Sequence, residues 1–267
     1  MTDERDYAAE LELVLDVLAE AAGLALSRSR SVTPVEKANK SYVTDLDKDL
    51  ERLIRGRLAA AFPDDRITGE EYAAEGGDGP RRWSIDPIDG TGNLVHGLPL
   101  WAVSVGLIVD GVPTLGAIVI PPLGETYWAV KGKGAWLDGR RLEVRDADAF
   151  HEQDNVCLGT NAMRTVDPRS MPGRLRDLGS ACCEQVFVAA GRLQATVFLG
   201  EQAHDVAAGV VISTEAGCAV GTVRDGRIDP ADFVARTPVP VPTFVAAPRR
   251  LESLLRSARA YPADRLS

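Results

Sequence analysis

The sequence predicts a mixed α/β protein in which helices and sheets are stacked in layers. Residues 6–28 place their apolar side chains along one helical stripe, and a second stripe of the same period begins near Thr44. From Arg82 to about Val144 the pattern changes to short strands joined by turns. Past Asp146 strands and helices alternate, so a helix pair, a strand meander and an alternating half follow one another along the chain.

Two amphipathic helices are expected near the N-terminus, separated by a polar, basic segment from Ser27 to Tyr42. The first covers residues 6–28, and the second starts near Thr44. Their buried faces are expected to contain Leu11, Val14, Leu15, Leu18 and Ala22 in the first helix, and Leu46, Leu50, Leu53, Ile54 and Leu58 in the second.

The middle of the chain predicts an antiparallel meander. Asp110-Gly111 and Asp138-Gly139 are dipeptides that turn one strand into the next. Strands are expected at Arg82–Ile85, Trp101–Val109, Thr114–Ile120, Thr126–Val130 and Ala135–Leu137.

The last part of the chain alternates between strands and helices. Strands are expected at Asn155–Gly159, Gln194–Leu199 and Thr243–Ala246, and helices at Ser180–Ala190, Asp205–Ala216 and Arg249–Arg259. The change of pattern near residues 146–152 predicts two closely packed halves, 1–148 and 149–267. The first half would carry Glu70, Asp86 and Asp89, and the second half Asp205, which are the candidate metal ligands described below.

Composition narrows the class of protein. The 267 residues are 45% hydrophobic and 26% charged, and the net charge of −9 disfavours nucleic acid as a partner. No apolar run approaches the ~18 residues of a membrane span, and the N-terminus lacks the regions of a signal peptide. The four cysteines show no zinc spacing, which favours reduced thiols in the cytoplasm.

The most informative segment is residues 83–99, WSIDPIDGTGNLVHGLP. Asp86 and Asp89 lie three residues apart across a proline, directly after an apolar run, and Gly90 and Thr91 follow at once. Carboxylates are hard ligands for Mg²⁺, and free N–H groups at a helix start bind phosphate oxygens. The plainer interpretation is a simple turn, because Asp, Pro and Gly are common turn residues.

Further acidic residues favour the metal-dependent phosphatase interpretation. Glu70 and Glu71 precede the segment, and Asp205 stands at the start of a predicted helix. Acidic groups that converge from separate elements repel one another unless cations are bound between them. His96 and His204 are not spaced as metal ligands of one another.

These motifs resemble the inositol monophosphatase family of lithium-sensitive, Mg²⁺-dependent sugar and cyclitol phosphatases. The resemblance covers about residues 8–220 and rests on Gly69–Glu71, Asp86–Thr91 and Asp205–Gly209, with Lys37, Val43–Asp47 and Glu215–Gly217 in support. It implies a layered αβαβα sandwich of the inositol monophosphatase/fructose-1,6-bisphosphatase type, a homodimer, and hydrolysis of a small-molecule phosphate ester. His204 occupies a position where the family usually has Trp.

The resemblance also implies roles for individual residues. Two Mg²⁺ ions are expected, the first on Glu70, Asp86 and the carbonyl of Ile88, and the second on Asp86, Asp89 and Asp205, with a weaker third against Glu70. Asp47 and Thr91 would orient and deprotonate the attacking water, with Glu70 assisting. The N–H groups of Gly90 and Thr91 would bind phosphate. The pair Thr44 and Asp47 also fits a helix-capping box, and Asp47 can do both.

The substrate side departs from the family pattern. Phe198 stands where many inositol phosphatases have a glutamate that accepts hydrogen bonds from substrate hydroxyls. Plain inositol phosphate is therefore not expected, and Glu201 is the candidate replacement. Substrate contacts are expected from Asp89, Ala181, Phe198, Glu201 and Lys37. The alternatives are a sugar phosphate, histidinol phosphate, a nucleoside phosphate stacked on Phe198, and a non-catalytic dimeric scaffold.

Overall fold

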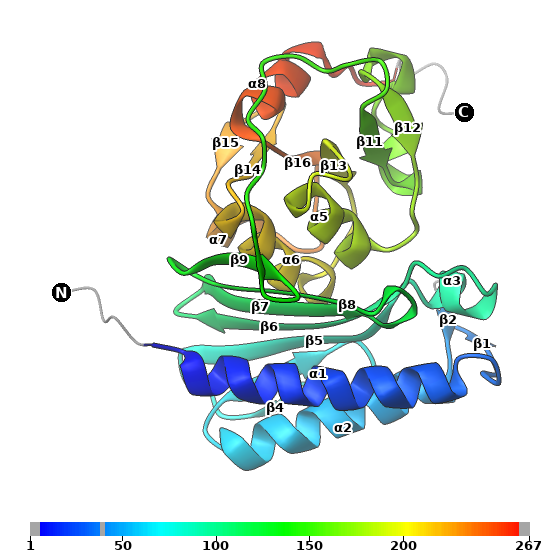
Figure 1. The fold of residues 1–267 in the computed structure, drawn as a ribbon, viewed down its shortest axis with the longest axis vertical. Helices are drawn as coiled ribbons and strands as arrows, with labels where there is room; N and C mark the ends of the chain where they lie inside the picture. The colour runs from blue at the N-terminus through cyan, green and yellow to red at the C-terminus, as the bar shows by residue number, and fades with distance from the viewer. Residues whose placement is uncertain (1–5, 38–40, 262–267) are drawn as a thin grey trace.

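The computed structural model describes residues 6–37 and 41–261, so the first residues of the N-terminal segment considered above lie outside it. Helices and sheets are stacked in the order helix, sheet, helix, sheet, helix (Figure 1). This is the layered αβαβα arrangement that the resemblance implied. Within the described ranges, no helix is both long enough and apolar enough to cross a membrane.

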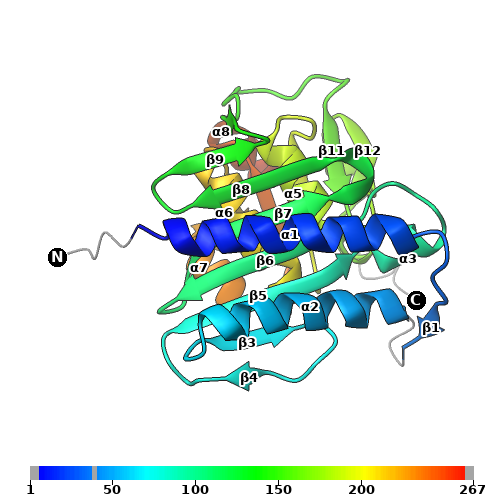
Figure 2. The ribbon, with the colours of Figure 1, turned by 60° about the horizontal axis from the view of Figure 1, so that its bottom comes forward.

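The first layer is the predicted helix pair, α1 (Ala8–Arg28) and α2 (Asp45–Ala61), which lie side by side under the first sheet (Figure 2). The predicted face of α2 is confirmed at Leu46, Leu50, Ile54 and Leu58, whereas Leu53 is only half-buried. The face of α1 is rotated from the prediction: Val14 and Leu18 are buried as expected, but Leu11, Leu15 and Ala22 are only half-buried. Val17, Ala21 and Ala25 complete the buried stripe instead.

The second layer is an eight-stranded sheet that contains the predicted meander. Its only parallel pair joins β3 and β5 among the strands described. Asp110 and Asp138 adopt φ of 50° and 47° before their glycines, as tight hairpin turns require. The strand order is β10 (Arg140–Leu142), β9 (Gly134–Leu137), β8 (Glu125–Val130), β7 (Val112–Ile120), β6 (Ala102–Val109), β5 (Arg81–Asp89), β3 (Arg66–Gly69) and β4 (Glu75–Gly76).

The fourth layer is a six-stranded sheet made by the second half of the chain. Its order is β12 (Arg174–Arg176), β11 (Asn155–Leu158), β13 (Ala195–Phe198), β16 (Thr243–Ala246), β14 (Ala219–Thr222) and β15 (Gly226–Ile228). α8 (Pro248–Ser257) covers its outer face (Figure 1). The prediction missed β3, β4, β10, β12, β14 and β15, because each of these strands has at most one large apolar side chain. It also missed the short helices α4 (Thr160–Met163) and α7 (Pro230–Ala235), which are shorter than two turns.

The third layer, α5 (Ala181–Ala189) and α6 (Ala203–Glu215), joins the two sheets. A Cβ at Gly116 of β7 would lie 2.2 Å from the carbonyl oxygen of Ala208, and one at Gly106 would lie 3.0 Å from the Ala208 nitrogen. The missing side chains therefore let α6 approach the first sheet closely. One hydrophobic cluster includes residues of both halves, and the division at residues 148 and 149 stays a prediction.

Candidate metal and phosphate site

The Asp86–Asp89 segment is a bulged continuation of β5, not a turn after it. The predicted strand ended at Ile85, but pairing with β6 continues, with Asp86 opposite Ser104 and Asp89 opposite Ala102. The three-residue step from Asp86 to Asp89 on β5 is therefore paired with a two-residue step from Ser104 to Ala102 on β6. In a regular strand, side chains three residues apart face opposite sides. The extra residue lets both aspartates line one cavity, and Pro87 is tolerated because a bulge frees it from donating to the ladder.

Gly90 ends the strand and starts the short helix α3 (Thr91–Val95). Its φ of 90° lies in the left-handed region, and a Cβ there would lie 3.0 Å from the carbonyl oxygen of Leu100. Only glycine fits this position easily. The turn brings Thr91 back over the strand, with its Oγ1 3.0 Å from both the Ile88 carbonyl oxygen and Asp47 Oδ1.

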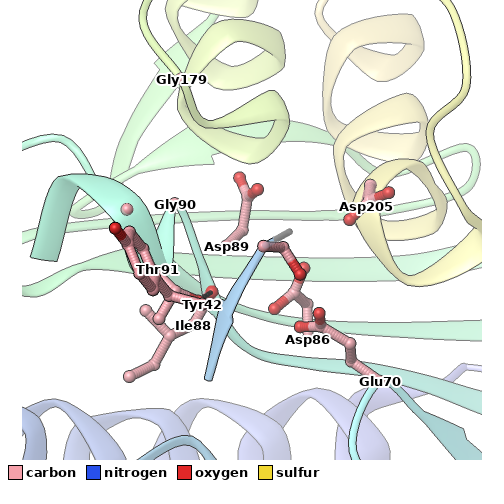
Figure 3. Close-up of a pocket in the computed structure, with 11 residues that line it drawn as sticks. Tyr42, Glu70, Asp86, Ile88, Asp89, Gly90, Thr91, Gly179 and Asp205 are labelled. Atoms are coloured by element: carbon pink, nitrogen blue, oxygen red, sulfur yellow. Dashed lines mark hydrogen bonds between the residues drawn. The ribbon is translucent and has the colours of Figure 1, made fainter. Parts of the chain in front are cut away.

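A cavity of about 360 Å³ opens above this bulge (Figure 3). Asp86 and Asp89 come from β5, Glu70 follows β3, and Asp205 comes from α6. All the predicted metal ligands and both predicted phosphate-binding residues line it. The lining is Ser41, Tyr42, Glu70, Asp86, Ile88, Asp89, Gly90, Thr91, Gly92, Gly179 and Asp205.

The acidic residues form two groups that share Asp86. One group is Glu70, Asp86 and His204, and the other is Asp86, Asp89 and Asp205. Within each group, one ligand atom per residue lies within 4.8 Å of the others. The first group contains a histidine that the sequence analysis did not include, because its partners come from segments distant in sequence.

Burial makes the ionised form of Asp86 unfavourable unless a positive charge or a proton compensates it. Asp86 is 1% exposed, and its Oδ1 has no hydrogen-bond partner among the described residues. Burial, and next the charges of Glu70, Asp89 and Asp205, raise its pKa well above the usual range. An unpaired buried carboxylate costs several kcal/mol unless a cation or proton compensates it. The donor set and this unpartnered oxygen fit divalent ions.

Asp89 is held by the start of α5. Its Oδ2 accepts hydrogen bonds from Ser180 Oγ and from the N–H of Cys182, at 2.5 and 2.6 Å. Burial and then the charge of Asp205 still raise the pKa of Asp89 to about 7. Ser180 was expected at a helix start, but its contact with this candidate ligand was not expected from the sequence.

Asp47 satisfies both of the geometries considered for it. Its Oδ2 accepts hydrogen bonds from the Thr44 N–H, at 2.8 Å, and from Thr44 Oγ1, which caps α2. Its Oδ1 accepts from Thr91 Oγ1. The carboxyl is buried, and this burial raises its pKa against the opposing effect of its hydrogen bonds. Its catalytic role stays a prediction.

Lys37 contacts the carboxylates beside the site. Its Nζ lies 2.8 Å from Glu70 Oε1 and 2.6 Å from Glu71 Oε1. The ammonium thus partly neutralises the acidic side of the cavity, where the sequence analysis expected a substrate contact. That contact stays a prediction.

A second cavity of about 270 Å³ shares Asp89, Gly179 and Asp205 with the first. Three predicted substrate residues, Asp89, Ala181 and Glu201, line it. Its other lining residues are Gly159, Thr160, Asn161, Asp177, Ser180 and Glu184. Oε2 of Glu201 is buried and has no hydrogen-bond partner among the described residues. Burial raises the pKa of Glu201 to about 7.

Phe198 lies in the hydrophobic core, which corrects the prediction of a substrate contact there. It is 1% exposed, lines neither cavity and stacks on Phe233 with ring centroids 6.2 Å apart. Its position at the end of the buried strand β13 turns the ring between this sheet and the helices beneath it. A nucleoside base has therefore no stacking surface at Phe198.

Comparisons with known proteins show which family the chain is similar to. The profile of the inositol monophosphatase family matches residues 6–262. Inositol-1-monophosphatase SuhB of Mycobacterium tuberculosis is 36% identical over 255 residues, covering 82% of this chain and 86% of that protein. Histidinol-phosphatase of Chlorobaculum parvum is 35% identical over 218 residues, covering 78% and 83%. The solved structure of a Thermotoga maritima IMPase superposes with a TM-score of 0.82 at 27% identity, covering 93% and 96%.

Proposed function

The chain belongs to the inositol monophosphatase family and is a phosphatase, and we propose that it hydrolyses a small phosphorylated polyol, sugar or cyclitol with Mg²⁺. The observation that carries this proposal is the bulge in β5. It lets Asp86 and Asp89 line one cavity with Glu70 and Asp205 next to the start of α3, and the two groups of metal-ligand candidates share Asp86 there. Such a pair of groups fits the two-ion chemistry of phosphate ester hydrolysis.

The metal ligands are proposed as follows. Glu70, Asp86 and the carbonyl of Ile88 would hold one ion, and Asp86, Asp89 and Asp205 the other. Divalent ions bound there would lower the pKa of a bound water and neutralise the leaving alkoxide. The burial of Asp86 keeps competing water from its ligand oxygens.

Thr91 and Asp47 would orient the attacking water. Thr91 Oγ1 donates its single proton to Asp47 Oδ1, which leaves an oxygen lone pair to accept a hydrogen bond from water. Because the pKa of the buried Asp47 carboxyl is raised, it can take up a proton more readily than an exposed aspartate. The N–H groups of Gly90 and Thr91 would bind phosphate oxygens across the cavity.

The second cavity would receive the leaving alcohol. Glu201 and Asp177 offer acceptor oxygens there, and Asn161 offers both donors and an acceptor. These groups match the hydroxyls of a polyol. The acidic lining also favours a second candidate, an amino-alcohol phosphate, and a relative named histidinol-phosphatase supports that choice.

The test is phosphate release across polyol, sugar, cyclitol, amino-alcohol and nucleoside phosphates, with and without Mg²⁺. We expect Glu201→Gln to raise KM most for the best substrate, while the exposed Glu252→Gln on α8 changes nothing. A folded protein that releases phosphate from none of these esters with Mg²⁺ would refute the proposal.

We also propose a homodimer in the cytoplasm. Leu26, Val35 and Leu98 are exposed by 49%, 61% and 52%. They belong to the end of α1, to β1 (Val35–Glu36) and to the segment after α3, which lie at one end of the molecule (Figure 2). Light scattering on the purified protein measures the mass, and a monomer would contradict the proposal.

A further inference from the structure

His204 lies among the metal-ligand candidates, although no partner for it was expected from the sequence. It precedes Asp205 in the first turn of α6, and its side chain is 19% exposed. A ring nitrogen of His204 and carboxylate oxygens of Glu70 and Asp86 all lie within 4.8 Å of one another. His96, the histidine compared with it in the sequence, is not part of this group.

This spacing is close to that of ligands on a shared ion. Two ligands with bonds of about 2.1 Å are about 4 Å apart when they lie on opposite sides of an ion. Small side-chain rotations therefore suffice to bring the three donors to one centre.

A second observation also indicates a cation at this place. Asp86 is almost completely buried, and its Oδ1 has no hydrogen-bond partner in the described part of the chain. The residue lines the cavity between Glu70 and Asp205 (Figure 3). A buried carboxylate oxygen left without a donor is strongly unfavourable, so the site is arranged for a ligand that supplies positive charge.

The chemistry of the donors suggests which ions the site prefers. Mg²⁺ takes oxygen ligands and loses its waters reluctantly. Imidazole is a better ligand for the later divalent transition metals, such as Co²⁺, Ni²⁺ and Zn²⁺. An added imidazole should therefore strengthen binding of these ions and leave Mg²⁺ binding nearly unchanged.

We propose that His204 is a ligand of the ion bound by Glu70 and Asp86, and that it shifts this site toward divalent transition metals. The proposal deepens the proposed function, on which it rests for the presence of an ion. Lys37 does not prevent it, because its ammonium also contacts Glu71 and keeps that partner when Glu70 turns to an ion.

The other contact of His204 gives the alternative to be tested. Its Nε2 lies 3.6 Å from Asp205 Oδ1, so the ring can instead serve only to position that carboxylate. A positioning role would affect all ions of the neighbouring group alike, whereas a ligand role discriminates between Co²⁺ and Mg²⁺.

The experiment is calorimetric titration of the metal-free full-length protein with Co²⁺ and with Mg²⁺, for the wild type, His204→Gln and the control His151→Gln. His151 is exposed and belongs to neither group of ligand candidates. We expect His204→Gln to weaken Co²⁺ binding on the order of ten-fold or more, and Mg²⁺ binding by less than about three-fold. The visible absorption of bound Co²⁺ should also change in this variant alone.

An unchanged Co²⁺ affinity, or equal losses for both ions, would overturn the ligand assignment. Thermal unfolding of the metal-free variants tests whether His204→Gln is folded, which we expect. Phosphate release with Mg²⁺ separates the two proposals: if no ester is hydrolysed while Co²⁺ binding still depends on His204, the proposed function fails and the ligand assignment stands. If hydrolysis persists and His204→Gln binds Co²⁺ as tightly as the wild type, only the ligand assignment fails.

Discussion

The Asp89→Asn substitution should stabilise the metal-free protein more at pH 8 than at pH 5. Burial and the nearby charge of Asp205 raise the pKa of Asp89 from its ordinary value of 3.8 to about 7. Between these two values the folded protein holds a proton that the unfolded chain has released. The stability contributed by this carboxyl therefore falls as the pH rises from about 4 to about 7, and it stays constant above.

The size of the effect follows from the two pKa values. Each pKa unit corresponds to about 1.4 kcal/mol, so the ionised Asp89 costs about 4 kcal/mol at pH 8. At pH 5 the unfolded carboxyl is already largely ionised and the folded one is not, which costs about 2 kcal/mol. The difference between the two pH values is therefore about 2–3 kcal/mol. Asparagine does not titrate, and its Oδ1 can accept the hydrogen bonds from Ser180 and Cys182.

The assay is urea unfolding with a chelator at both pH values. The free energy of unfolding of Asp89→Asn, relative to wild type, should rise by about 2–3 kcal/mol from pH 5 to pH 8. The exposed Asp64→Asn serves as the matched control and should show no such change. Added Mg²⁺ should stabilise the wild type more than Asp89→Asn. A difference that is equal at both pH values would show that the carboxyl does not titrate as argued.

Three further substitutions test the close packing of α6 on β7, the core position of Phe198 and the catalytic role proposed for Asp47. Gly116→Ala should force α6 away from β7, because the new Cβ would lie 2.2 Å from the carbonyl oxygen of Ala208. We expect the free energy of unfolding in urea to fall by about 1–3 kcal/mol. We also expect a lower kcat, because α6 carries Asp205. Phe198→Leu should cost about 1–2 kcal/mol of stability and leave KM unchanged, because the ring is in the core. Asp47→Asn should lower kcat by about 10²-fold or more without changing the calorimetric affinity for Mg²⁺.

Each of these expectations has a result that contradicts it. Unchanged stability and kcat in Gly116→Ala would mean that α6 does not depend on the close approach. A raised KM in Phe198→Leu would indicate that the ring contacts the substrate. Wild-type kcat in Asp47→Asn would leave the carboxyl with its helix-capping role alone.

The long periodic elements were predictable because their burial repeats along the sequence. The helix pair, the meander and α6 were found near their observed bounds, and the hairpin dipeptides were located correctly. Strands β3 and β14 were missed although β11 and β16 have the same length of four residues, because β3 and β14 each contain only one large apolar side chain, Ile67 and Val220, and so show no apolar run. The rotation of the buried face of α1 shows a similar limit of local pattern. The helix has neighbouring apolar stripes, and the tertiary contacts determine which of them is buried.

The bulge in β5 was not predictable from local pattern. Asp, Pro and Gly favour a turn, and a turn was the natural interpretation of the segment after Ile85. Pairing with β6 keeps the segment extended instead, since Ser104 and Ala102 supply the opposite edge. The bulge therefore depends on a partner strand about fifteen residues away, which local propensities do not report.

Sequence spacing predicts the positions of the candidate metal ligands better than those of the residues expected to contact the substrate. Asp86, Asp89 and Asp205 lie on a paired strand and in the first turn of a helix, where backbone geometry determines the direction of each side chain. Spacing within a family therefore transfers directly to these ligands. Phe198 and Glu201 flank the end of β13, where one residue points into the core and the other into the second cavity. The position at which the resemblance led us to expect an acceptor therefore holds a core ring in this chain, and Glu201, three residues later, is the proposed acceptor instead. Specificity in this chain is consequently to be sought at Glu201, and the identity of the bound metal at His204.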